Sequence, residues 1–287
     1  MERDARRKVV AYLVLTLLLA APFYYLILSA GSLGVRGGIY VLGVMWAPGL
    51  AAIITRAVHQ RDLRGVGWGW GQSRYQLASY LIPVAAGTIV YSLAWALGIA
   101  GFDPGGLAGD SGRGTLEVIA LAATVGVLQS AIPALGEEIG WRGLLVPELA
   151  KAFSYTKVSI FCAVVWSVYH FPALLFADYT SDAPRWYALV MFTVGITGAS
   201  FMATWLRLKS GSVWTGVLLH ASHNLFIQGV FDGLTNNRMY TEFITTEFGV
   251  GLAVVYAGGA YWCWRNRGSL PTSMSATTDH GLARDEA

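Results

Sequence analysis

The sequence contains little charge for its length. Only 13% of the 287 residues are Asp, Glu, Lys or Arg, whereas 55% are hydrophobic, and the mean hydropathy is positive. This composition excludes an ordinary soluble domain and is typical of a polytopic membrane protein, for which the lipid bilayer is the principal partner. The net charge of +3 is too small to indicate a nucleic-acid-binding protein.

Cysteine is scarce as well. The two cysteines, Cys162 and Cys263, lie inside apolar runs, and neither a CxxC nor an HExxH spacing occurs in the sequence. A disulfide framework is therefore not expected, and each cysteine is most simply a small buried side chain. Neither a metal ion nor another cofactor is predicted.

Long apolar segments recur along the chain. Eight of them are close to the length that crosses a bilayer as a helix. We therefore predict an all-α fold, a polytopic membrane helix bundle with about eight transmembrane helices, in a single catalytic domain at residues 1–267. Residues 268–287, rich in Ser, Thr and Asp, are expected to form a disordered cytoplasmic tail. The eight segments are residues 9–30, 38–58, 77–101, 116–135, 158–177, 186–206, 213–231 and 248–264.

Basic residues are distributed unevenly between the loops. If the N-terminus is cytoplasmic and the segments alternate, the cytoplasmic loops and ends hold 15 of the 20 Lys and Arg residues, and the outside loops hold 4. Arg142 is the remaining one, and the outside loops instead carry acidic residues such as Asp178 and Asp182. This bias predicts a cell-membrane protein with both termini in the cytoplasm.

One charged motif adjoins an apolar segment. Glu137 and Glu138 follow the run at 116–135, and Arg142 comes four residues after Glu138. On a helix Glu138 and Arg142 can pair, whereas Glu137 points about 100° away and is left to face another partner. Ionised side chains at membrane depth are costly and are usually functional, so this motif is the first candidate site.

Two later segments carry further polar side chains. His170 lies four residues after Trp166, and Asn224 four residues after His220, so each pair shares one helical face. Counting along the predicted helices puts these residues and the glutamate at one level, in a cavity that we expect to open toward the cytoplasm. His223 lies off this face, and we expect it to be structural or to lie at the lipid edge.

These residue types permit hydrolysis by an activated water. A carboxylate and an imidazole can bind a water and take its proton, and a second imidazole with an amide can stabilise an oxyanion. The sequence offers neither a serine paired with a base nor a candidate catalytic cysteine. Two alternatives remain open: a zinc protease with His170, His220 and a glutamate as ligands, or a non-catalytic immunity, partner-binding or transport protein.

The three motifs resemble the CAAX protease and bacteriocin-processing (CPBP/Abi) family of intramembrane glutamic endopeptidases, which includes the Ras-converting CAAX proteases. The family pattern is EExxxR, then FxxxH, then HxxxN on successive membrane helices. This sequence has EEIGWR at 137–142, Trp166 in place of Phe four residues before His170, and His220 four residues before Asn224. The resemblance covers roughly residues 136–224, and elsewhere it extends only to hydropathy.

This resemblance implies an endopeptidase without a metal, acting on a membrane-associated or lipidated peptide. Because Trp166 retains an aromatic ring, only the shape of the cavity beside His170 is in doubt. The implied roles are water activation by Glu137 and His170, an oxyanion hole formed by His220 and Asn224, and support from the pair Glu138 and Arg142.

Overall fold

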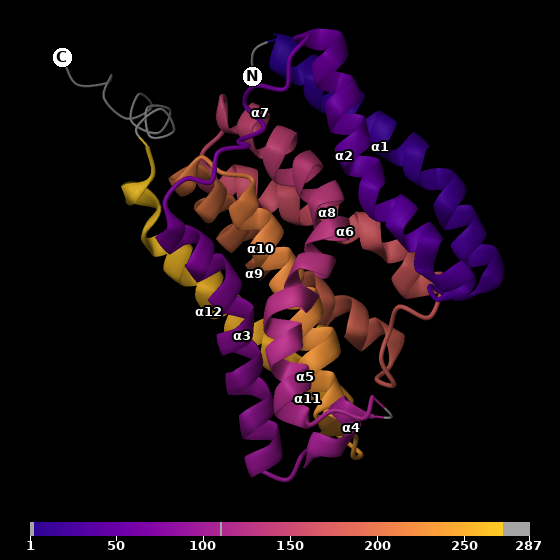
Figure 1. Ribbon diagram of the computed structural model, residues 1–287. Coiled ribbons are helices and arrows are strands. Elements are labelled where there is room, and N and C mark those ends of the chain that lie inside the picture. Colours follow the sequence, from indigo (N-terminus) through magenta and orange to yellow (C-terminus); the bar gives the residue numbers. More distant parts are fainter. Residues whose placement is uncertain (1–2, 110, 272–287) are drawn as a thin grey trace.

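The computed structural model describes residues 3–109 and 111–271 and is almost entirely helical (Figure 1). The strands in this part of the chain are β1 (Gly101–Phe102) and β2 (Thr235–Asn236), which pair antiparallel. The predicted all-α bundle is therefore confirmed. The predicted tail lies outside the described residues from residue 272 onward.

In the described part of the chain, the long helices form eight rods, one at each of the eight predicted segments. Six rods are long and apolar enough to cross a bilayer: α1, η1 with α2, α3, the rod at 115–150, α8 and α9. The other two, α10 with η4 and the 16-residue α12, agree with the segments expected there to within two residues but are not among these six. The bounds are α1 (Arg3–Ala30), η1 (Val35–Gly38), α2 (Ile39–His59), α3 (Ser73–Ala96), α4 (Pro104–Ala108), α8 (Tyr155–Phe176), α9 (Arg185–Ser210), α10 (Trp214–Leu225), η4 (Phe226–Phe231), α11 (Thr241–Ile244), α12 (Val250–Arg265) and η5 (Arg267–Ser269).

The fourth rod is longer than predicted. It runs for 36 residues, from Thr115 to Ala150, and does not stop near residue 135. At 1.5 Å per residue it is roughly 54 Å long. The helix continues because the charges that suggested its end are neutralised inside the bundle. It comprises α5 (Thr115–Leu121), the π-helical η2 (Ala122–Gly126), α6 (Val127–Gly140), the π-helical η3 (Trp141–Leu145) and α7 (Val146–Ala150).

Glycines bring α6 into backbone contact with α2. A Cβ added at Gly136 would lie 2.7 Å from the carbonyl oxygen of Met45, and one added at Gly49 would lie 2.4 Å from the carbonyl oxygen of Gly136. Gly140 is equally close to Pro48. Small residues four apart permit such contact between membrane helices. The contact holds one face of α6 against α2 and leaves the glutamates on the face toward the bundle interior.

The basic loop at residues 60–72 folds back onto the bundle. Its Val66 is 0% exposed, and a Cβ at Gly143 would lie 3.1 Å from the Val66 side chain. Arg56 donates to the carbonyl oxygens of Arg64, in the loop, and of Gly143, each at 2.7 Å. Arg207 donates to the carbonyl oxygens of Val66, in the loop, at 3.2 Å and of Arg142 at 2.8 Å. Two buried guanidinium groups therefore fasten this loop over the end of the bundle that carries the basic residues.

Candidate active site

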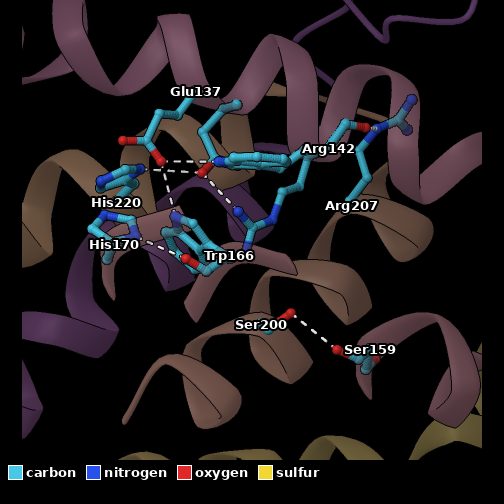
Figure 2. A network of polar contacts seen from close by, with 10 residues as sticks. Glu137, Arg142, Ser159, Trp166, His170, Ser200, Arg207 and His220 are labelled. Carbon is cyan, nitrogen blue, oxygen red and sulfur yellow. Dashed lines mark hydrogen bonds and ion pairs between the residues drawn. The ribbon is translucent and has the colours of Figure 1, made fainter. Parts of the chain in front are cut away.

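Glu137 lies inside the bundle on α6 and is 1% exposed. Its Oε2 accepts hydrogen bonds from the indole Nε1 of Trp141 at 2.9 Å and of Trp166 at 2.8 Å (Figure 2). Among the residues that the structure describes, none donates a hydrogen bond to Oε1. One carboxylate oxygen is thus anchored by two donors, and the other remains available to a ligand.

Glu138 forms the expected pair with Arg142. Its Oε1 accepts from Arg142 Nη1 at 2.8 Å, and both side chains are 1% exposed. The same oxygen lies 3.2 Å from Nδ1 of His220, on α10. The guanidinium also lies over the ring of Trp166, with Cζ 4.2 Å from its centroid, in a cation–π contact. Glu138 therefore joins helices α6, α8 and α10 through a buried charge network.

His170 has a defined tautomer. Its Nδ1 lies 2.8 Å from the backbone oxygen of Trp166, and because a carbonyl only accepts, Nδ1 must carry the hydrogen. Nε2 is then a lone-pair acceptor when the ring is neutral. The ring packs against Phe192 and Tyr179, with centroid distances of 5.3 and 6.1 Å. The i,i+4 spacing of Trp166 and His170 thus orients the imidazole.

A cavity of about 260 Å³ is lined by four of the six predicted site residues. Figure 2 shows the Glu137 carboxylate next to the rings of His220 and His170, and the centroid of the His220 ring lies 5.4 Å from that of Trp166. Glu138 and Arg142 stand behind this cavity, where they line a smaller one of about 60 Å³. The predicted residues on the larger cavity are Glu137, His170, His220 and Asn224.

The wall of the larger cavity lies toward one end of the bundle. It includes Tyr24 and Ile27, in the last turns of α1, and Val41 and Val44, in the first turns of α2. That end holds the connection between α1 and α2 and lies opposite the end that carries the basic loop at residues 60–72.

The tryptophans of the site were underestimated from the sequence. Trp166 contributes an indole donor to Glu137 that the phenylalanine of the family pattern lacks, so the difference concerns more than the shape of the cavity. Trp141 was given no role, although its position four residues after Glu137 puts it on the same helical face. The i,i+4 spacing of Glu137 and Trp141 could therefore have predicted this contact from the sequence.

A second polar cluster adjoins the site and was also missed. His223 Nε2 lies 3.2 Å from Glu247 Oε2, and its Nδ1 lies 2.8 Å from the hydroxyl of Tyr256. Gln228 donates to both oxygens of Glu247, at 2.9 and 3.0 Å. His223 therefore faces the protein interior and not the lipid edge. The cost of a carboxylate beside the last apolar segment could have identified Glu247.

The zinc alternative requires His170, His220 and a glutamate to be grouped around one point. Nε2 of each histidine would be the ligand, because each Nδ1 already has a protein partner. Within residues 3–109 and 111–271, no three His, Cys, Asp or Glu side chains are grouped so that they could hold a metal ion. The donor set of the zinc alternative is thus not assembled in this arrangement.

The fold and the site define a polytopic helical membrane protein with a buried glutamate–histidine centre. Residues 118–226, which contain all the predicted site residues, match the family model described as Type II CAAX prenyl endopeptidase Rce1-like. CAAX prenyl protease 2 of Methanococcus maripaludis is 33% identical over 95 residues, which cover 31% of this chain and 34% of that protein. The chain thus aligns with about a third of the length of this curated relative. Both matches support the assignment of the chain to the CAAX protease family, as the three motifs predicted.

Proposed function

We propose that the protein is an intramembrane endopeptidase that hydrolyses a peptide bond with water activated by Glu137 and His170. One observation carries this proposal. Hydrogen bonds occupy Oε2 of Glu137 and Nδ1 of His170, and this leaves a carboxylate oxygen and an imidazole nitrogen for the single cavity that both residues line. A carboxylate and an imidazole in this state can bind a water and accept its proton.

In the proposed reaction, the water oxygen attacks the peptide carbonyl while Glu137, aided by His170, takes the water proton. His220 and Asn224 donate hydrogen bonds to the oxyanion of the tetrahedral intermediate. The contact between His220 Nδ1 and Glu138 stabilises a protonated imidazole, whose Nε2–H is then the donor. The proton passes to the leaving amine as the C–N bond breaks, so no covalent enzyme intermediate forms.

Glu138 and Arg142 are positioning residues in this scheme. Both are buried, and loss of one partner of such a pair typically costs about 3–5 kcal/mol because a charge remains unpaired. The pair holds His220 from behind, and Arg142 also stacks on Trp166, which bonds Glu137. It therefore links the two halves of the proposed site.

The substrate class that we propose is a membrane-associated or lipidated peptide. Two of the lining residues, Val41 and Val44, belong to a membrane-spanning helix, so an apolar substrate segment could approach from the bilayer. The relative's name, CAAX prenyl protease 2, supports a lipidated substrate. We propose that residues 1–267 form one catalytic domain in the cell membrane and that the reaction uses no cofactor.

The test is cleavage of a fluorogenic, membrane-anchored peptide by protein purified in detergent. Glu137→Gln and His170→Ala should each abolish cleavage. Glu148→Gln is the matched control, because Glu148 is a buried carboxylate on the same rod that bonds Lys151 and does not line the cavity. Full activity of Glu137→Gln would refute the proposal, and loss of wild-type activity with a strong zinc chelator would favour a metal enzyme.

A further inference from the structure

The exposure of α10 and η4 changes along the cavity. His220 is buried, Asn224 one turn later is half-buried, and Gln228 one turn further is exposed. All three line the cavity. Because α10 runs from the end with the basic loops toward the opposite end, the cavity becomes more open in that direction (Figure 1).

The cavity lining on other helices extends toward the same end of the bundle. On α8 the lining continues from His170 to Ala173 and then to Tyr179, beyond the end of that helix. Tyr24 on α1 and Met45 on α2 lie toward the connection between those two helices, which is at this same end. The lining residues thus lie on one side of the catalytic pair on four separate helices.

The opposite side of the site is closely packed, and the cavity that Glu138, Arg142 and Gly216 line there has a volume of only about 60 Å³. On the rod at 115–150, the turns that follow Glu137 contain Trp141, Leu144 and Leu145, which are all buried. Beyond them lies the loop at residues 60–72, held by Arg56 and Arg207 to backbone carbonyls of the rod. A peptide would have to displace this loop and both buried cations in order to enter from that end.

Charge assigns the two ends to the two sides of the membrane. The filled end carries the basic loops, whereas the open end carries the acidic ones. At the open end a polar cavity of about 650 Å³ shares Gln228 with the catalytic cavity and is also lined by Asp178 and Asp182. By the positive-inside rule the filled end is cytoplasmic and the open end is not.

We propose that the substrate reaches Glu137 and His170 from the non-cytoplasmic side of the membrane. The substrates are then peptides or membrane proteins whose cleaved segment lies outside the cytoplasm, close to the bilayer. This inference rests on the proposed hydrolysis for its substrate, but the direction of access follows from the cavity and the charges alone. It replaces the cytoplasmic opening expected from the sequence.

Cysteine labelling in intact cells tests the direction. The background is replaced by alanine at Cys162 and Cys263, and single cysteines are introduced as Gln228→Cys at the cavity mouth and Arg64→Cys in the loop at the filled end. A membrane-impermeant maleimide should label Gln228→Cys in intact cells, and Arg64→Cys only after permeabilisation. Thr180→Cys, in the wall of the polar cavity, is the second reporter if Gln228→Cys does not fold.

A second measurement follows access to the reaction itself. Met45→Cys lies on the cavity wall, so modification with a bulky impermeant reagent from outside should lower cleavage at least tenfold in sealed vesicles, and Arg64→Cys should be unaffected. Labelling of Gln228→Cys only after permeabilisation would overturn the inference even if the detergent-purified enzyme cleaves peptide. Labelling from outside by a protein that cleaves nothing in detergent would support the direction and count against the proposed function.

Discussion

Replacement of Gly216 tests the charge network of Glu138, Arg142 and His220 behind the proposed catalytic cavity. A Cβ at this position would lie 2.4 Å from Glu138 Oε2 and 3.3 Å from Arg142 Cγ. The carboxylate has little freedom to move, because Arg142 and His220 hold its other oxygen at 2.8 and 3.2 Å. Gly216→Ala must therefore displace Glu138 from at least one of these partners.

The expected magnitude combines two opposing effects. In an exposed helix Gly→Ala stabilises by about 1 kcal/mol, whereas disruption of a buried ion pair costs about 3–5 kcal/mol. The free energy of unfolding of Gly216→Ala should therefore fall by about 2–4 kcal/mol. Because His220 moves with its partner, and a misplacement of about 1 Å can cost about 100-fold in rate, cleavage should decrease by a similar factor.

The assay uses the native cysteines. Cys162 and Cys263 are 3% and 5% exposed, so a thiol-reactive fluorophore should report thermal unfolding in detergent. Gly258→Ala in α12 is the control, because its added Cβ would have no neighbour within 4 Å and should stabilise by about 1 kcal/mol. Adding Glu138→Asp to Gly216→Ala shortens the carboxylate side chain and should recover part of the lost stability.

Two results would refute this reasoning. One is a Gly216→Ala variant that unfolds at or above the wild-type temperature and retains full activity. The other is strict additivity of Gly216→Ala and Glu138→Asp, because residues in contact should show coupling of about 0.5–3 kcal/mol. Either result would mean that Glu138 is not held against α10.

Three further predictions concern groups outside the catalytic cavity. Burial and the nearby carboxylate of Glu247 raise the pKa of Asp232 from 3.8 to about 7, so its ionisation destabilises the fold as the pH rises from about 4 to 7. Asp232→Asn should remove this loss: in the thiol assay, the free energy of unfolding should rise by up to about 4 kcal/mol at pH 8 and not at all near pH 4. A pH profile equal to that of the wild type would contradict this prediction. Arg207→Met leaves the carbonyl oxygens of Arg142 and of the loop at 60–72 without their donor, and should lower the free energy of unfolding by about 2–4 kcal/mol. The loop should also be cut faster by trypsin, as seen on a gel. Wild-type resistance to trypsin would show that Arg207 does not hold the loop. Glu247→Gln weakens the charge-assisted contact with His223 and should lower the free energy of unfolding by about 1–3 kcal/mol in the same assay. An unchanged value would show that the contact between His223 and Glu247 does not stabilise the fold.

Local spacing accounts for much of what could be predicted. Glu138 and Arg142 meet because side chains four apart on a helix are neighbours in any surroundings. The same geometry places Nδ1 of His170 on the carbonyl of Trp166. The eight rods follow from hydropathy, since only helices satisfy the backbone of such apolar segments in lipid. These features need no knowledge of which helix lies beside which.

The errors arose where distant segments decide the outcome. Glu137 and Glu138 suggested the end of a span because an isolated charge is costly, but indoles, a guanidinium and an imidazole from other turns and helices satisfy them. His223 was expected to be structural or to lie at the lipid edge, and the sequence could not decide between these because its partner Glu247 is 24 residues away. The glycine contact between α2 and α6 was likewise invisible without the pairing of those helices.

The sequence by itself determined the helical membrane fold, the three motifs and the sign of charge at each end of the bundle. Hydropathy, i,i+4 spacing and loop charge are local properties, and each can be read without a partner. Only the tertiary structure decided which oxygen of Glu137 and which nitrogen of His170 are held by protein partners, and which residues line the cavity between them. Those features depend on how helices pack and on where a loop folds back, which are contacts between segments far apart in the chain.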